Sequence, residues 1–135
     1  MKVLALVALV AGALPLPASA AELLVCELRQ YGGGNWIPEA LFIGREVGAE
    51  TAIVSDTVVL QFNAGPVGAR VAADNAARTT YVWSIAVRDR GGTYAPSMLY
   101  RATYLKATGR MEISATPAGF DTRFQGGGTC QRRLR

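Results

Sequence analysis

The sequence contains no histidine, and this absence removes several kinds of chemistry at once. Ser-His-Asp and Cys-His nucleophilic sites need an imidazole base, and many zinc sites use imidazole ligands. The chain also has just two cysteines, Cys26 and Cys130, which are too few for a metal site built from thiolates. We therefore expect no metal, no cofactor and no catalysis by a thiol.

Acidic residues are few and scattered, which gives little basis for a hydrolase. Paired carboxylates, as in glycosidases, stay an alternative, but no spaced pair stands out. Acids in turn-like segments are normally solvated, and this group contains Asp56, Asp74, Asp89 and Asp121. Lys106 is the only lysine after residue 2, and its place next to a turn favours a solvent-facing strand end. We predict that the protein is not an enzyme.

Charge of either sign is not concentrated in one region. The chain carries 14 Lys and Arg against 10 Asp and Glu, for a net charge of +4. Singly scattered charges favour solubility over a nucleic-acid partner. The one local cluster, Arg132, Arg133 and Arg135, is interpreted as a solvated tail.

Long apolar runs are absent after residue 20. The opening "MKVLALVALVAGALPLPASA" places Lys2 before an apolar run, Val3–Leu14, and ends in small residues at Ala18 and Ala20. This is the layout of a secretory signal peptide, with cleavage expected after Ala20. The run is shorter than the roughly 20 residues that span a membrane. We expect a periplasmic or secreted protein with no membrane span in the mature chain.

The two cysteines are predicted to form one disulfide, Cys26 to Cys130, because an even cysteine count in an exported chain indicates oxidation. Residues 21–135 are expected to form a single domain, and the disulfide would join its two ends. In the chain-entropy model, closing a loop of about 100 residues stabilises a fold by up to roughly 4.7 kcal/mol. That is a large share of a typical domain stability of about 5–15 kcal/mol.

A run of three glycines lies near each cysteine, Gly32–Gly34 after Cys26 and Gly126–Gly128 before Cys130. A phosphate-binding loop leads into a helix and is followed by Lys and Ser or Thr, and neither run has this context. The favoured interpretation is structural, since a missing Cβ lets the chain bend sharply or lets two backbones approach closely. Ligand binding by the glycines is the alternative.

Short apolar runs broken by Gly, Pro, Asn and Asp at intervals of about ten residues predict an all-β domain. The predicted strands are Leu23–Leu28, Trp36–Ile43, Thr51–Val54, Thr57–Phe62, Pro66–Ala72, Thr79–Asp89, Ser97–Ala107, Met111–Pro117 and a last one from Phe120 towards Cys130. The segment around Asn75 is interpreted as a loop or one helical turn. About seven to nine strands suit a small antiparallel β-barrel or a sandwich. Closure is favoured, because the disulfide joins the first and last strands and removes exposed edges.

Aromatic residues make up only 8% of the chain, yet four of them, Tyr81, Trp83, Tyr100 and Tyr104, fall on two neighbouring predicted strands. Inside a barrel these rings would be core, which is the favoured interpretation. Exposed rings would instead offer a stacking platform for sugars or single-stranded nucleic acid, although export disfavours nucleic acid. Arg101 is a charge in an otherwise apolar strand, and it could meet an anionic group at the barrel mouth. Candidate ligand-binding residues are therefore Arg101, Tyr100, Tyr104 and Trp83.

The segment "YRATYLKATGRMEISATPAGFDTRFQGGGTC", residues 100–130, resembles the C-terminal part of short exported bacterial proteins known only as uncharacterised families. The resemblance implies a periplasmic or secreted β-rich module and assigns no functional residues. The chain is more distantly similar to small periplasmic lysozyme inhibitors, which are β-barrels with a disulfide. No inhibitor motif matches, and a net positive chain is poorly suited to cationic lysozymes.

We expect a non-enzymatic exported module that contacts another envelope protein or forms part of an assembly. The alternatives are a small-ligand binder using the barrel mouth around Arg101, an envelope-associated enzyme inhibitor, and a carboxylate-based hydrolase. An exposed apolar patch would favour the first function, and a pocket with Arg101 facing inward would favour ligand binding. Two buried carboxylates about 5–10 Å apart would favour the hydrolase.

Overall fold

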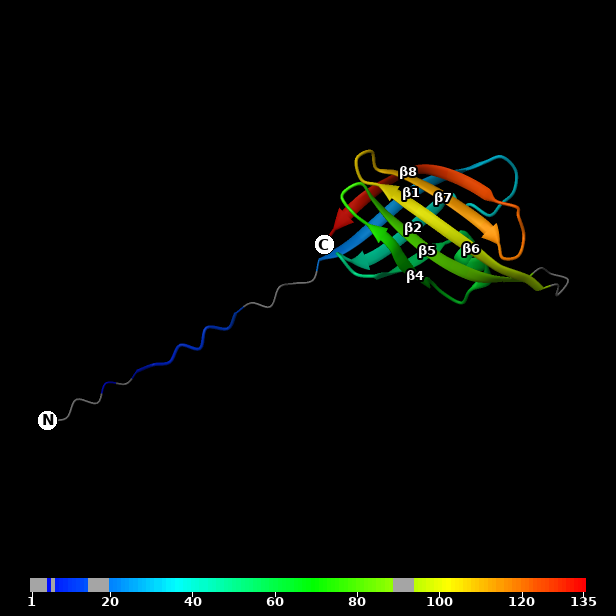
Figure 1. Cartoon of the computed structure of the whole chain (residues 1–135). Coiled ribbons are helices and arrows are strands. Elements are labelled where there is room, and N and C mark those ends of the chain that lie inside the picture. The colour runs from blue at the N-terminus through cyan, green and yellow to red at the C-terminus, as the bar shows by residue number, and fades with distance from the viewer. Residues whose placement is uncertain (1–4, 6, 15–19, 89–93) are drawn as a thin grey trace.

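From residue 21 onward the chain closes into a barrel of eight antiparallel strands, as the computed structural model shows (Figure 1). The structure describes residues 5, 7–14, 20–88 and 94–135. The elements are β1 (Ala21–Tyr31), β2 (Ala40–Glu46), β3 (Thr51–Asp56), α1 (Thr57–Phe62), β4 (Val67–Asp74), β5 (Arg78–Arg88), β6 (Tyr94–Leu105), β7 (Arg110–Pro117) and β8 (Phe124–Leu134). The predicted all-β class and barrel closure are confirmed. The predicted glycine-containing loop between β5 and β6 lies outside the described residues.

Each strand pairs with its neighbours in the sequence, and β8 returns to pair with β1. The blue first strand and the red last strand lie side by side in Figure 1. This order follows from short connections, because adjacent antiparallel strands need only tight turns. The result is a meander whose two ends meet, so no strand of the barrel has an unpaired edge.

Alternating side chains of the strands fill the barrel interior. On β6 the inward residues include Tyr100, Ala102 and Tyr104, and on β5 they include Tyr81 and Trp83, all of them buried. The rings of Trp83 and Tyr100 stack with their centroids 5.3 Å apart and an interplanar angle of 1°. The interpretation of these aromatic side chains as core is therefore confirmed.

The predicted strand Thr57–Phe62 is wrong, because this segment forms helix α1. Its β-branched residues favour a strand locally. However, the carboxylate of Asp56 caps the helix by accepting a hydrogen bond from the backbone N–H of Val59 at 2.8 Å. Val58 and Val59 are then buried against the barrel core. Burial of this apolar face outweighs the local preference for an extended chain.

Two predicted strands begin later than expected. β2 begins at Ala40 rather than Trp36, because the backbone N–H groups of Trp36 and Ile37 donate to the Gln30 side chain at 3.1 and 3.0 Å. β8 begins at Phe124 rather than Phe120, which follows a tight turn. The segment around Asn75 is a loop and not a helical turn.

Residues 7–14 run away from the barrel in Figure 1, and their large apolar side chains are almost fully exposed. Among the described residues, regular structure begins at Ala21, directly after the predicted cleavage position. Among the described residues, no helix is both long and apolar enough to cross a membrane.

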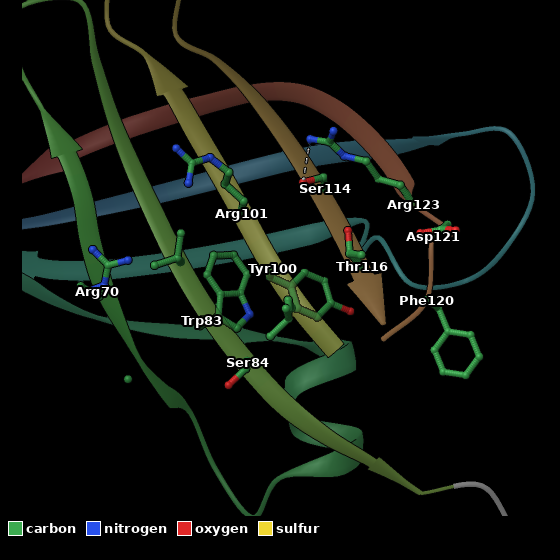
Figure 2. A pocket seen from close by; sticks show the side chains of 13 residues that line it. Arg70, Trp83, Ser84, Tyr100, Arg101, Ser114, Thr116, Phe120, Asp121 and Arg123 are labelled. Carbon is green, nitrogen blue, oxygen red and sulfur yellow. Dashed lines mark hydrogen bonds between the residues drawn. The ribbon is translucent and has the colours of Figure 1, made fainter. Parts of the chain in front are cut away.

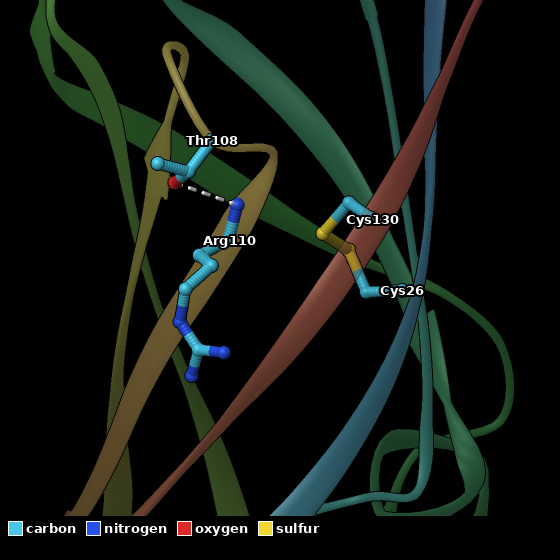
Figure 3. Close-up of a disulfide and its surroundings, with 4 residues drawn as sticks. All are labelled: Cys26, Thr108, Arg110 and Cys130. Atoms are coloured by element: carbon cyan, nitrogen blue, oxygen red, sulfur yellow. Dashed lines mark hydrogen bonds between the residues drawn. A yellow bond between two sulfur atoms is a disulfide. The ribbon is translucent and has the colours of Figure 1, made fainter.

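A disulfide joins Cys26 of β1 to Cys130 of β8, as predicted (Figure 3). The two cysteines lie directly opposite each other in the β1–β8 ladder although 104 positions separate them in the sequence. The bond therefore fastens the two strands whose pairing closes the barrel.

Two glycines of β8, Gly126 and Gly128, let that pairing form. A Cβ on Gly126 would lie 2.6 Å from the carbonyl oxygen of Arg29, and one on Gly128 would overlap the carbonyl oxygen of Glu27. Both carbonyls belong to β1, so only residues without a Cβ fit this close approach. In the other run, Gly32 and Gly34 have positive φ values of 83° and 106°, which suit glycine in a turn. Neither run leads into a helix, and the structural interpretation of the glycines is supported.

Replacing both cysteines by alanine should lower the free energy of unfolding of residues 21–135 by about 2–5 kcal/mol, because the unfolded chain regains the entropy of an open loop. Urea denaturation measures the effect. Wild-type protein unfolded under reducing conditions is the control and should lose a similar amount. A double variant as stable as the oxidised wild type would contradict the role given to the disulfide.

Gly128→Ala should destabilise the barrel by about 1–3 kcal/mol, because its methyl group has no space beside β1. Gly44→Ala is a matched control in strand β2, where a Cβ would meet nothing within 4 Å. We expect the control to be neutral or slightly stabilising, since glycine inside a strand is unfavourable. Thermal unfolding of the two variants gives the comparison, and equal losses would show that steric closeness is not the cause.

Candidate functional site

The buried carboxylates do not form a hydrolase pair. Glu22 and Asp56 are the buried acids among the described residues. In the register of the sheet, Glu22 lies opposite Arg45 and Asp56 lies opposite Leu41 on the same strand, β2. Four residues of a strand separate these positions by about 13 Å along the barrel, beyond the spacing of glycosidase carboxylates. The described residues also hold no group of three His, Cys, Asp or Glu that could bind a metal ion.

One end of the barrel carries paired charges. The inward-facing Arg45 donates to Asp74 at 2.7 Å, and Lys106 donates to the same carboxylate at 3.0 Å. Glu22, which is 6% exposed, pairs with Arg132 at 3.0 Å. Paired charges of this kind satisfy one another, and we interpret this end of the barrel as structural.

Tyr81 lies inside the same end of the barrel, with the Arg45 guanidinium carbon 6.0 Å from its ring centroid. Burial raises the pKa of the Tyr81 hydroxyl to about 12. The phenol therefore stays neutral over the whole physiological range and adds no charge to this cluster.

The structure places Arg101 on the outer face of β6 and not at the barrel mouth. Its neighbours along the strand, Tyr100 and Ala102, face inward, so alternation turns the Arg101 side chain outward. Tyr104 and Trp83 also lie in the core. Of the four predicted ligand-binding residues, Trp83, Tyr100 and Arg101 line one hollow and Tyr104 does not, and Arg101 is the one whose side chain is exposed.

An open hollow of about 930 Å³ lies on the outer face of strands β4 to β7 (Figure 2). Its edges carry three exposed arginines, Arg70 of β4, Arg101 of β6 and Arg123 from the segment before β8. We call this hollow the arginine groove. Its lining also includes two exposed apolar side chains, Leu99 at 47% and Phe120 at 60% exposure, and the less exposed Val82, Trp83 and Tyr100.

Strand register brings two of these arginines together. Arg70 lies opposite Val82, and Val82 lies opposite Arg101, so a single row crosses three strands. The two steps add to about 10 Å between the Cα atoms of Arg70 and Arg101. Ser114 extends the same row beyond Arg101.

The third arginine reaches this row from a connecting segment. The Arg123 Nη2 atom donates to the Ser114 hydroxyl at 3.4 Å, which sets its guanidinium beside Arg101 (Figure 2). A smaller hollow of about 220 Å³ adjoins the groove and shares Arg101, Ser114 and Arg123 with it. Arg101 and Arg123 are thus accessible from both hollows, and Glu112 also lines the smaller one.

The arginines of the groove lack carboxylate partners within the described residues. Arg45, Arg110 and Arg132 each form a salt bridge at 2.7 to 3.2 Å, whereas none is formed by the three arginines of the groove. The acid that lines the groove, Asp121, does not pair with them. Three guanidinium groups against one carboxylate leave the hollow with a net positive charge, and the local positive potential attracts anions.

Another hollow, of about 710 Å³, lies between the start of β2 and the end of β1. It is lined by charges of both signs, with Arg29 between Glu27 and Glu39. Mixed charges compensate one another and give no preference for an anion or a cation. The arginine groove is therefore the stronger candidate for a binding site.

Sequence reasoning singled out Arg101 but missed Arg70, Arg123 and Phe120. Strand alternation alone would place Arg70 and Arg101 on the outer face, so the sequence predicts that both side chains are exposed. That Arg70 and Arg101 are neighbours depends on the register of three strands. The positions of Arg123 and Phe120 depend on the path of the loop between β7 and β8.

The carboxyl group of Asp74 should make stability depend on acid pH. Hydrogen bonds from Arg45 and Lys106 lower the pKa of Asp74 from 3.8 to about 2. Because this pKa is lowered in the folded state, the contribution of Asp74 to the free energy of unfolding is complete above about pH 4 and is lost as the pH falls towards 2. The advantage of wild type over Asp74→Asn in unfolding free energy should therefore shrink between pH 5 and pH 2, by at most about 1 kcal/mol because solvent screens the pair. Urea unfolding at both pH values measures it, and a constant difference would contradict the assignment.

Comparisons with protein-family models, with curated proteins and with solved structures return no match, so the interpretation of the arginine groove depends on its own chemistry.

Proposed function

We propose that the protein is an exported, non-enzymatic binding module that holds an anionic partner or ligand in the arginine groove. The observation that carries this proposal is the set of three exposed guanidinium groups, without carboxylate partners in the described residues, around a hollow of about 930 Å³. The barrel interior, filled by aromatic and aliphatic side chains, serves stability.

Guanidinium groups suit this role because each offers a planar set of donors that matches carboxylate or phosphate oxygens. Arg70 and Arg101 stand on paired strands of a closed barrel, so their backbones are already fixed before a ligand arrives. A preorganised site loses less conformational entropy on binding. Leu99 and Phe120 add apolar contact area beside the cations.

The chemistry of the groove favours binding over bond breaking. Its side chains are mainly arginines, hydroxyls and apolar groups, with the single acid Asp121. Arginine stays protonated and cannot act as a general base, and a serine needs such a base to become a nucleophile. A binding module is the function that these residues support best.

Export is supported by three features. The disulfide is a bond that persists in oxidising compartments. The opening segment has the layout of a signal peptide, and its described residues 7–14 are separate from the barrel. In the part of the chain that the structure describes, the first strand starts at Ala21, after the expected cleavage position. The periplasm or the secreted fraction is the proposed location.

Removing two charges from the groove should weaken anion binding. The probes are tripolyphosphate, tetraglutamate and tetragalacturonate, titrated calorimetrically into residues 21–135. We expect at least one probe to bind, and Arg70→Gln/Arg101→Gln to weaken it about tenfold or more, a loss of roughly 1.4 kcal/mol.

The matched control is Arg78→Gln/Arg133→Gln, which removes two exposed arginines outside the groove. It should change the affinity less than threefold. If no probe binds, or if both double variants weaken binding equally, the groove is not a specific anion site and the proposal is wrong.

A further inference from the structure

Gly68 is the second residue of β4, lies on the outer face, and lines the arginine groove. Its backbone does not have the positive φ that requires glycine. Packing does not require glycine either, because a Cβ at this position would meet nothing within 4 Å. Glycine inside a strand costs about 0.5–1 kcal/mol relative to alanine.

Gly68 therefore differs from the glycines of β8, which the neighbouring strand makes necessary. Glycine in a strand also occurs where a ligand approaches the backbone closely. Its place in the groove fits this last reason, since the missing side chain leaves the β4 side of the hollow open next to Arg70.

Hydroxyl groups form a second row in the groove, parallel to the row of arginines. Ser84 lies opposite Leu99, and Leu99 lies opposite Thr116. Two residues along each strand separate this row from the row of Arg101, a distance of about 7 Å. A hydroxyl both donates and accepts hydrogen bonds, whereas a guanidinium group only donates. The groove therefore suits a ligand that carries acid groups and hydroxyl groups together.

Phe120 adds an exposed aromatic ring at the edge of the groove (Figure 2). Its 60% exposure leaves ring surface that no neighbour covers. A flat apolar ring can pack against the C–H face of a sugar ring through dispersion contacts. The groove therefore suits a ligand with three features: acid groups that contact the arginines, hydroxyl groups that contact the serine and threonine row, and a ring that packs on Phe120. An acidic sugar has all three.

An extended acidic peptide fits this surface less well. Peptides commonly bind a β-sheet by adding a strand to an unpaired edge, and the closed barrel has none to offer. A peptide on the outer face would have to satisfy its main-chain groups through a few side chains. A sugar has no main chain of this kind, and its polar groups match the hydroxyls and guanidinium groups present.

We infer that the arginine groove binds an acidic oligosaccharide, with its carboxylates on Arg70 and Arg101 and a sugar ring lying over Gly68. This inference rests on the proposed function, because it specifies the ligand of the same groove.

The test compares four-residue ligands by calorimetry with residues 21–135. Tetragalacturonate is the acidic sugar, maltotetraose is the neutral sugar, and tetraglutamate is the acidic peptide with the same number of side-chain carboxylates. We expect tetragalacturonate to bind at least tenfold more tightly than tetraglutamate, and maltotetraose to bind more weakly than either.

Gly68→Val should weaken tetragalacturonate binding at least tenfold, because its side chain would occupy the β4 side of the groove, where we place a sugar ring. Valine is favourable in a strand, so thermal stability should be unchanged or higher. Gly44→Val is the matched control, a strand glycine outside the groove that also has open space around its Cβ position. It should bind like wild type. Phe120→Ala, a change at an exposed loop residue, should weaken the sugar more than the peptide and gives a second reading if Gly68→Val is unstable.

The possible failures are distinguishable. If tetraglutamate binds as tightly as tetragalacturonate, and Arg70→Gln/Arg101→Gln weakens both, the inference of an acidic sugar ligand is wrong, but the proposal that the groove binds anions is supported. If Gly68→Val and Phe120→Ala both bind the sugar like wild type, the placement of the ring is overturned. If none of the anionic probes binds, the proposed function falls together with this inference.

Discussion

The pairing of β1 with β8 is the contact on which the rest of the structure depends. It joins the two ends of the domain over ten register pairs, from Glu22 to Tyr31, and turns an open meander into a closed barrel. The disulfide fastens this seam near its middle, and the glycines of β8 let the backbone of β1 approach. A side chain at Gly126 or Gly128 would force the two strands apart, and the sheet would then expose two edges.

Closure determines where function can lie. A barrel of eight strands has an interior about wide enough for its own side chains. Here the stacked rings of Trp83 and Tyr100 occupy that space, and helix α1 adds Val58 and Val59 to the same core. The outside of the sheet stays accessible to a ligand. The arginine groove lies there, on strands that the closed ladder already holds in place.

Charges are treated differently on the two faces of the sheet. Inside the barrel end, Arg45 and Glu22 each have a partner of opposite sign, because an unpaired buried charge is strongly destabilising. On the outer face, water can solvate Arg70 and Arg101, so they persist without a carboxylate beside them in the described structure. Because these arginines stay solvated, they cost the fold little stability, and their N–H donors remain available to a ligand.

The sequence by itself determined the alternation of inward and outward residues, the strand-rich class and the cysteine pair, because each depends on local spacing or on a simple count. It also indicated that Tyr81 and Trp83 belong to the core. Only the tertiary structure decided that Thr57–Phe62 is a helix, since burial against the barrel end overrides the extended preference of its β-branched residues. Only the register placed Arg70 in one row with Arg101, and only the path of the β7–β8 connection brought Arg123 to Ser114. Neighbours across strands are non-local, so no property of either segment alone specifies them.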